Sequence, residues 1–229
     1  MKTTLFLFSL FFVNTTFFGQ DKKVIQDSLI QQMIPKAYEL EEVVLSNDVK
    51  TKTLEIGLTK DKYLQAFENG AKLEVKFFPY YPIYKKTNFI KNVTFHTENK
   101  LEKATFKVHF YAVDPNGLPG KALLDRDCIV SVKTGTRKTS FNILYLNLEI
   151  PTKGLFVVFE KLVIQSNSFE KKNVNGTYSQ KTFQPNIFFN SVEKNIQFKY
   201  TNGKWSQRRN KDNSTLIFNE PAIYLTLTN

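Results

Sequence analysis

Histidine and cysteine, the side chains that most often hold metals or act as nucleophiles, are scarce in this chain. Its two histidines, His96 and His109, fall on different expected strands, and Cys128 is its single cysteine. A structural zinc site needs four ligands from His, Cys or carboxylates, so these residues predict none. Cys128 begins the apolar run Cys-Ile-Val-Ser-Val, where a buried thiol behaves as a small hydrophobic side chain. Because the sequence also contains neither a Gly-x-Ser-x-Gly elbow nor a glycine-rich phosphate loop, we expect no catalytic nucleophile and no cofactor.

Loop carboxylates are the remaining source of metal ligands. Asp114 with Asn116, or Asp125 with Asp127, could supply two or three oxygens to Ca²⁺. The spacing of an EF-hand loop is absent, and Asp and Asn are also common turn residues. We therefore predict turn and surface roles for them and no metal site.

One acid interrupts a strand that is otherwise apolar on both faces. Glu160 lies within residues 155–164, a run rich in Leu, Val, Ile and Phe. A buried glutamate either pairs with a cation, here a Lys or Arg on a neighbouring strand, or has a raised pKa. Two interpretations stay open: a polar anchor in a ligand cleft, or a structural acid where the strand emerges from its cover.

Aromatic side chains near turns give the second candidate site. Tyr80, Tyr81 and Tyr84 cluster in the proline-containing segment 78–84, and Trp205 lies beside basic residues after a turn. Sugar-binding β-sandwiches stack planar side chains on sugar rings, and exposed aromatic surface often marks a contact site. The alternative is that these rings only cap the ends of a sandwich.

The elements that must position these residues are mostly strands. Residues 59–70 predict one brief helix, with a Thr start and an Asn-Gly end. After Gly70 apolar and polar residues alternate, most clearly over 104–112, which indicates strands with one buried face. Residues 155–164 predict a central strand covered on both sides, and 222–228 predict the last strand.

Further strands are expected at 128–132, 140–150 and 196–200, with a polar loop over 167–180. Asn202-Gly203 is a strong two-residue hairpin signal. About nine or ten strands without strand–helix alternation predict an all-β fold, an antiparallel, jelly-roll-like β-sandwich with one short helix. In sequence order we expect a signal peptide at 1–20, a leader at 21–50, partly mobile or with a short helix and a β-prone segment, and the sandwich at 51–229.

The N-terminus has the layout of a secretory signal. A positive start, Met-Lys, precedes an apolar run over 5–13 and a small residue, Gly19. The run is too short to cross a membrane, which takes about 20 apolar residues, although an uncleaved anchor is the alternative. We expect an exported protein, in the periplasm, on the outer-membrane surface or outside the cell, with no transmembrane segment after the signal.

The chain is basic, with a formal net charge of +11, or +10 once Lys2, the only charged residue of the signal, is removed (11 − 1 = 10). A charge of this size attracts phosphate, anionic lipid or acidic polysaccharide. The Lys and Arg are nevertheless spread in short clusters. A solvated basic surface therefore fits better than a nucleic-acid interface, and we expect no nucleic-acid partner.

Two segments resemble parts of a known group of proteins. Residues 38–45, Tyr-Glu-Leu-Glu-Glu-Val-Val-Leu, are similar to a stretch that follows a carboxypeptidase-regulatory-like domain in exported proteins tied to TonB-dependent receptors. Within 70–165, Val-Asp-Pro-Asn-Gly-Leu-Pro-Gly and Gly-Leu-Phe-Val-Val-Phe-Glu resemble uncharacterised secreted β-sandwich domains of the same bacteria, which are similar in architecture to galactose-binding-like and carbohydrate-binding modules. The resemblance implies a cell-envelope protein and supplies no catalytic residues.

We therefore expect a non-catalytic β-sandwich that binds a glycan or an envelope protein. Its candidate ligand-binding residues are Tyr80, Tyr81, Tyr84, Trp205 and Glu160. A hydrolase acting on carbohydrate, with Glu160 and a loop aspartate as its acids or with a Ser-His-Asp cluster assembled by the fold, is one alternative. A structural subunit that uses an exposed edge strand is another. The sequence does not indicate an oligomeric state.

Overall fold

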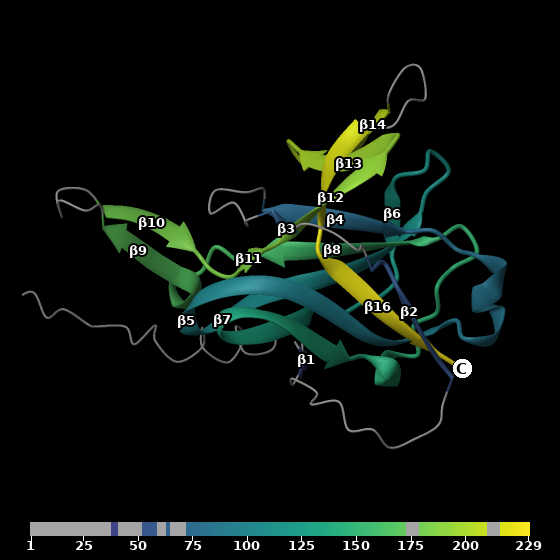
Figure 1. Cartoon of the computed structure of the whole chain (residues 1–229), viewed down its shortest axis with the longest axis horizontal. Helices are drawn as coiled ribbons and strands as arrows, with labels where there is room; N and C mark the ends of the chain where they lie inside the picture. Colours follow the sequence, from purple (N-terminus) through teal and green to yellow (C-terminus); the bar gives the residue numbers. More distant parts are fainter. Residues whose placement is uncertain (1–37, 41–51, 59–62, 65–71, 173–178, 210–215) are drawn as a thin grey trace, which may run out of the picture. The chain divides into compact units, whose positions relative to one another are not determined.

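The computed structural model describes residues 38–40, 52–58, 63–64, 72–172, 179–209 and 216–229 (Figure 1). These residues form β-strands joined by turns and three short 3₁₀ helices, so the chain is all-β, as its alternation predicts. The expected signal peptide lies outside the described residues, as does the expected leader apart from Tyr38–Leu40. Within the described part, no helix is long and apolar enough to cross a membrane.

The elements follow the chain in this order: β1 (Tyr38–Leu40), β2 (Thr53–Ile56), β3 (Tyr63–Leu64), β4 (Leu73–Phe78), η1 (Pro82–Lys86), β5 (Phe89–Val113), β6 (Pro119–Ala122), β7 (Cys128–Asn142), η2 (Leu144–Leu146), β8 (Leu155–Lys161), η3 (Gln165–Asn167), β9 (Ser168–Lys172), β10 (Ser179–Phe183), β11 (Asn186–Ile187), β12 (Phe189–Lys194), β13 (Ile196–Thr201), β14 (Lys204–Arg209), β15 (Leu216–Pro221) and β16 (Ile223–Thr228). Among the described strands every pairing is antiparallel except that of β1, which runs parallel to β7.

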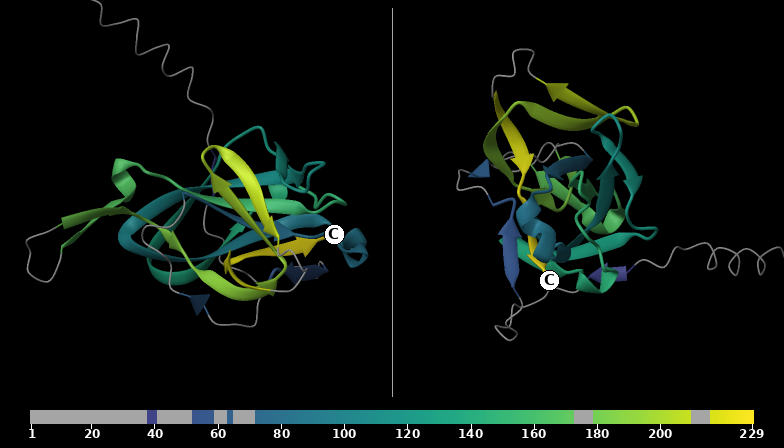
Figure 2. Two further views of the ribbon diagram at one scale, coloured as in Figure 1. Left: turned by 90° about the horizontal axis from the view of Figure 1, so that it is seen from above. Right: turned by 90° about the vertical axis from the view of Figure 1, so that its right-hand side faces the viewer.

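Two long strands, β5 and β7, form a ribbon that belongs to both layers of the sandwich, and Figure 2 shows them side by side. The half of β5 before Asn99 pairs with β16, and the half after Lys103 pairs with β8. The rings of Phe95 and Phe106, on opposite halves, lie 4.8 Å apart. A straight strand would separate these two residues by roughly 36 Å, at about 3.3 Å per residue. The ribbon therefore folds back on itself between its halves.

The bend in β5 lies at the register shift between Asn99 and Lys103. There the Asn99 amide donates hydrogen bonds to the carbonyl oxygens of Leu101 and Val132, at 2.9 and 3.1 Å. Opposite the bend, Gly135 has φ +105°, in a region that side chains disfavour. The sequence predicts separate strands at 128–132 and 140–150, and the structure joins the first to the start of the second in β7.

The layers enclose a core rich in phenylalanine. Phe106 and Phe159 have ring centroids 4.5 Å apart, and Phe95 contacts both and also Phe141. All four side chains are fully buried. Burying one such ring stabilises the fold by roughly 1.5–3 kcal/mol. The prediction of a central strand over 155–164 is confirmed for Leu155–Lys161, because β8 lies between β4 and β5 and is buried on both faces. It is wrong for the end of the run, where Val163 and Ile164 lie outside the strand and are exposed.

The β13–β14 hairpin covers the face of β4, β8 and β5 that points away from this core. Phe198 of β13 packs on Phe77 and Phe156, at centroid distances of 5.9 and 4.8 Å. Asn202 and Gly203 have φ of +52° and +78°, which confirms the two-residue turn.

Two expectations of local structure are wrong, and a third, the strand over 140–150, holds only as far as Asn142, because Leu144–Leu146 form η2. Tyr63 and Leu64 fall within the expected helix but form strand β3 against β12, while the other residues of that segment lie outside the described residues. The expected polar loop over 167–180 contains most of a second hairpin, β9–β10. In both cases pairing with another strand decides the conformation, and local composition does not reveal it.

Candidate functional site

The outer face of β4, β8 and β5 carries the strongest candidate site. Successive side chains of a strand point to opposite faces, so Phe156, Val158 and Glu160 of β8 point away from the main core. The register places Val158 between Val75 of β4 and His109 of β5. Glu160 thus lies at the end of an apolar row and beside a histidine, at the place where the hairpin cover ends.

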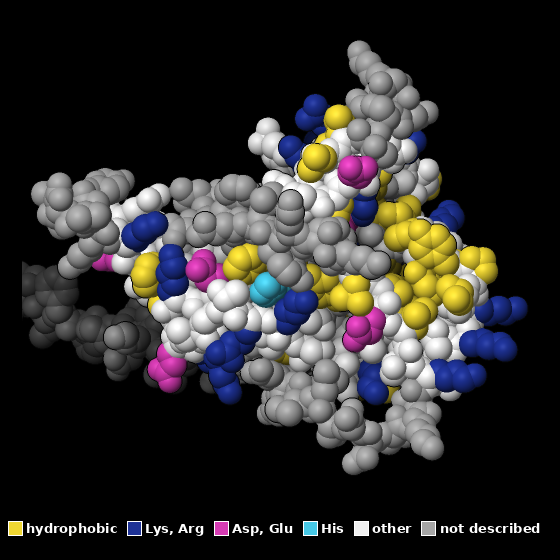
Figure 3. All heavy atoms as spheres, viewed as in Figure 1, with side chains coloured by type: hydrophobic (Ala, Val, Ile, Leu, Met, Phe, Trp, Pro, Cys, Tyr) yellow, Lys and Arg dark blue, Asp and Glu magenta, His cyan; other side chains and the backbone are white. Residues whose placement is uncertain are grey.

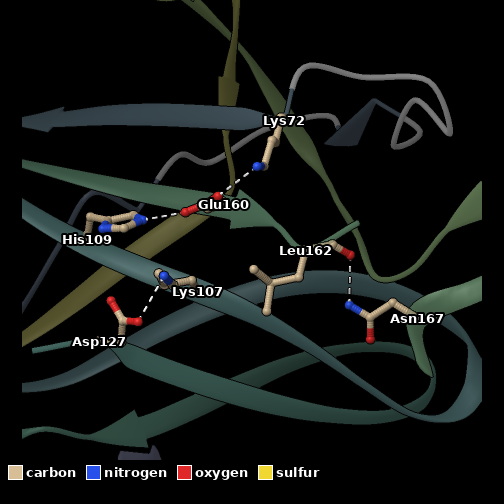
Figure 4. Close-up of polar contacts among 7 residues, drawn as sticks. All are labelled: Lys72, Lys107, His109, Asp127, Glu160, Leu162 and Asn167. Carbon is tan, nitrogen blue, oxygen red and sulfur yellow. Dashed lines mark hydrogen bonds and ion pairs between the residues drawn. The ribbon is translucent and has the colours of Figure 1, made fainter. Parts of the chain in front are cut away.

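Glu160 is held by two partners, as Figure 4 shows. Its Oε2 lies 2.7 Å from His109 Nε2, and its Oε1 lies 3.2 Å from Lys72 Nζ. The Glu160 side chain is 16% exposed and that of Lys72 60% exposed, so solvent reaches the cluster. Burial alone would raise the pKa of Glu160, but its hydrogen bonds and attraction to His109 and Lys72 outweigh burial and lower that pKa below 4.5. Glu160 is therefore an ionised hydrogen-bond acceptor at neutral pH.

A chain of aromatic rings continues from His109 toward the hairpin. The ring of His109 stacks on Tyr111 with centroids 5.8 Å apart, and Tyr111 meets Trp205 edge-on at 6.1 Å. Trp205 in turn lies 4.8 Å from Tyr200 on the neighbouring strand. Burial, with Glu160 and Tyr200 nearby, raises the pKa of Tyr111, so its phenol keeps its proton. We call the following residues together the outer-face site: Lys72, His109, Tyr111, Glu160, Tyr200 and Trp205.

A cavity of about 420 Å³ lies against the same face. Val75 and Phe77 of β4 line it from one side, and Phe198, Lys199 and Tyr200 of the hairpin line it from the other. Its size falls within the range of small-molecule pockets, and its mixture of rings and polar groups is typical of them. Tyr200 belongs to both the cavity and the outer-face site, so a ligand could extend from one to the other.

Of the sequence-predicted residues, the structure brings Glu160 and Trp205 onto this face, joined through His109 and Tyr111. It does not bring the three tyrosines there.

Tyr80 and Tyr81 make edge contacts with Tyr84, at 6.0 and 5.6 Å. Tyr84 is 7% exposed and belongs to the main core, and Tyr80 packs against that core. This packing of Tyr80 and Tyr84 fits the alternative that these rings cap the sandwich, whereas Tyr81 is 52% exposed.

A second cavity, of about 590 Å³, lies where Tyr81 and Tyr84 meet a buried charged cluster. Lys76 is 3% exposed, its Nζ lies 3.2 Å from a Glu220 oxygen, and it donates a 2.7 Å hydrogen bond to the Gly57 carbonyl. Lys194 contacts the other Glu220 oxygen. Burial lowers the pKa of Lys76, and Glu220 partly opposes this. The closed cluster, Lys76, Lys194 and Glu220, thus connects β4 to β12 and β15.

Two of the loop carboxylates considered for calcium, Asp114 and Asp127, have structural partners. Asp114 Oδ1 accepts hydrogen bonds from the backbone N–H groups of Asn116 and Leu118, both at 2.8 Å, and so closes its own turn. Asp127 pairs at 3.0 Å with Lys107, which lies directly opposite Glu160 in the register of β5 and β8 (Figure 4). Nowhere in the described ranges do three or more His, Cys, Asp or Glu gather in a way that could hold a metal ion.

The single thiol and the second histidine are also in structural positions. Cys128 is 2% exposed, and burial raises its pKa to about 11, so little reactive thiolate forms at neutral pH. His96 stacks on Phe188 at 4.5 Å. Burial and, secondarily, Lys138 lower the pKa of His96.

Sequence reasoning missed four members of the outer-face site: Lys72, His109, Tyr111 and Tyr200. The alternation of residues 104–112 does place His109 and Tyr111 on the polar face of their strand, which was the available signal. Their partners come from β8 and β14, so only the pairing of distant strands reveals the set.

Chemically, the outer-face site can accept hydrogen bonds at Glu160, donate them from Lys72, and offer the rings of Trp205 and Tyr200 for stacking. These groups suit a ligand with both polar and apolar surfaces.

No protein-family model, curated protein or solved structure matches this chain.

Proposed function

We propose that the protein is a non-enzymatic binding protein of the cell envelope whose outer-face site binds a glycan. The observation that carries the proposal is the continuity of Glu160, His109, Tyr111 and Trp205, all partly exposed, from the outer face of the sheet to its hairpin cover. A sugar ring presents a flat C–H face and a rim of hydroxyl groups. Aromatic side chains match the first, and an ionised carboxylate flanked by donors matches the second.

The state of Glu160 favours binding over acid catalysis. Most glycoside hydrolases need two carboxyl groups about 5–10 Å apart, one of them protonated through a raised pKa. The pKa of Glu160 is lowered, and its contacts in the described residues are to His109 and Lys72 rather than to a second acid. A permanently charged acceptor is suited to holding hydroxyl groups.

Export supports the same proposal. Residues 1–20 have the layout of a secretory signal, and glycans are abundant in the envelope and outside the cell. A partner protein is the other ligand class that an exposed aromatic face suits. The glycan is preferred because the polar and aromatic groups lie beside a pocket-sized cavity rather than on a broad apolar patch.

The experiment is a glycan-array screen with the purified protein, followed by calorimetric titration of the strongest glycan. We expect Trp205→Ala and Glu160→Gln each to weaken binding at least tenfold, which corresponds to about 1.4 kcal/mol. The matched control is Tyr145→Ala, which removes a 51% exposed ring on η2, outside the site.

Tyr81→Ala is a second arm that tests the other aromatic candidate. Unchanged binding in this variant supports the outer-face site, whereas a tenfold loss in it alone moves the site to η1. If Trp205→Ala and Glu160→Gln both bind like the wild type, the outer-face site is wrong. If no glycan binds, the proposal as a whole is overturned.

A further inference from the structure

The β13–β14 hairpin has a second, outward face with a charge pattern of its own. Its register pairs Tyr200 with Trp205 on the face that packs on the sheet. The alternate pairs therefore point outward, since successive strand residues point to opposite sides. These outward pairs are Gln197 with Arg208, Lys199 with Ser206, and Thr201 with Lys204.

All the charged side chains on this outward face are cations. Lys199, Lys204 and Arg208 are exposed, although Lys199 also lines the edge of the 420 Å³ cavity beside β4. Neither strand of the hairpin contains an Asp or Glu. In Figure 3 Lys and Arg side chains lie around the hairpin, with an acidic side chain near them, and others are spread over the rest of this face. Neighbouring rows on one face of a strand are about 6.6–6.8 Å apart, so the cations form a short, closely spaced group.

Three lysines elsewhere in the sandwich provide a contrast. Lys72, Lys76 and Lys107 are each paired with a carboxylate at 3.0–3.2 Å. Within the described ranges, Lys199, Lys204 and Arg208 have no such ion pair. Three like charges on one face, without intervening acids, repel one another and attract an external anion.

We propose that the outward face of this hairpin binds the carboxylates of an acidic polysaccharide, so that the glycan of the outer-face site is an anionic one. The inference rests on the proposed function, because Trp205 shares strand β14 with Lys204 and Arg208, and one chain of sugars that crosses the hairpin edge would meet both faces. Arg208 can hold a carboxylate with two parallel hydrogen bonds, and the lysines add point charges. A polymer with one carboxylate per sugar meets several of these cations at once.

The test compares polygalacturonate with neutral galactan as probes, both titrated into the full chain at low and at physiological salt. We expect polygalacturonate to bind at least tenfold more tightly, with the advantage falling as salt screens the charges. Replacing Lys199, Lys204 and Arg208 together by Gln is expected to remove this advantage and to leave galactan binding unchanged. The control removes the same charge elsewhere, by changing the exposed Lys85, Lys86 and Lys121 to Gln, and is expected to change the affinity less than twofold.

The outcomes separate this inference from the proposed function. The outer-face site and the cationic face are both supported by two results together. Trp205→Ala must lose binding of polygalacturonate and of galactan, and the variant with Lys199, Lys204 and Arg208 replaced by Gln (the hairpin variant) must lose only the added affinity for polygalacturonate. If the hairpin variant keeps the full preference, or if the control variant loses as much as the hairpin variant, the inference is overturned while the glycan site stands. If polygalacturonate binding depends on the hairpin but Trp205→Ala changes neither probe, the outer-face site fails and the cationic face is retained.

Two further probes test the class of polyanion. Phosphatidylglycerol vesicles and a DNA duplex carry phosphate in place of carboxylate. If either binds as tightly as polygalacturonate with the same dependence on the hairpin cations, the assignment to a polysaccharide is overturned. We expect both to bind at least tenfold more weakly.

Discussion

Two lysine–glutamate clusters lie within a few residues of each other along β4, and their surroundings give them different roles. In the closed cluster, Glu220 holds Lys76, which is 3% exposed, and also Lys194. In the outer-face site, Glu160 holds Lys72, which is 60% exposed, and His109. The residue types are nearly the same. Burial makes the first a structural connection between strands, and exposure leaves the second available to a ligand.

The largest effect that this comparison predicts follows removal of the buried charge of Glu220. Glu220→Gln keeps the shape but leaves Lys76 charged and unpaired in the interior, which is expected to cost about 3–5 kcal/mol of unfolding free energy. Urea denaturation followed by circular dichroism measures it. Glu193→Gln, at an exposed position on β12, is the matched control and is expected to change stability by less than about 0.5 kcal/mol. Equal effects in the two variants would contradict the structural role of the closed cluster.

A double variant sharpens the interpretation of that loss. In Lys76→Met/Glu220→Gln the buried cation is gone, so the penalty for an unpaired charge disappears. We expect the double variant to be more stable than Glu220→Gln alone by about 1–3 kcal/mol, because replacing a buried pair by neutral groups is often close to neutral. A double-mutant cycle with Lys76→Met measures the coupling. Simple additivity of the two single effects would show that the pair does not act as a unit.

Glu160→Gln is expected to separate stability from binding. Because Lys72 is mostly exposed, losing the ion pair should cost less than about 1 kcal/mol. The same variant is expected to bind the array-identified glycan at least tenfold more weakly. Urea denaturation and calorimetric titration on one protein sample measure both. A stability loss as large as that of Glu220→Gln would place Glu160 among the structural acids.

The smallest predicted effect is a dependence of stability on pH. The pKa of Glu160 is lowered in the folded protein, so the stability that this carboxylate contributes is fully present above about pH 4.5. This stability is lost as the pH falls through the pKa of Glu160 in the folded protein, because below that pKa Glu160 is protonated in the folded and the unfolded chain alike. The difference in unfolding free energy between wild type and Glu160→Gln should therefore shrink toward zero as the pH is lowered from 6 to 3. A difference that grows at acidic pH would have the wrong sign.

Much of the fold follows from alternation in the sequence. The apolar residues at 104, 106, 108 and 110 predict the buried face of β5, which is confirmed. The run over 155–164 predicts a strand covered on both sides, which is confirmed as far as Lys161. The union of 128–132 with the start of 140–150 could not be predicted, because the bend at Asn99 and Gly135 depends on how β5 and β7 pair. Pairing across the chain also decides β3, β9 and β10.

The candidate site was only partly visible in the sequence for the same reason. Glu160 was found because an acid inside an apolar strand is conspicuous, and its pairing with a cation on a neighbouring strand matches one of its two expected states. Trp205 was found by its place after a strong turn. His109 and Tyr111 look like ordinary residues of a polar strand face until β8 and β14 are placed beside them. Burial alone, which no local pattern reveals, distinguishes Tyr84 from Tyr81.

The β5–β7 ribbon has a consequence for how the molecule comes apart. Because one continuous pair of strands supplies hydrogen bonds to both layers, neither layer can be peeled away without opening part of the other. The two layers should therefore unfold together, as one cooperative unit, under force, heat or proteolysis. Amide protons on both halves of the ribbon should exchange with solvent at similar, slow rates.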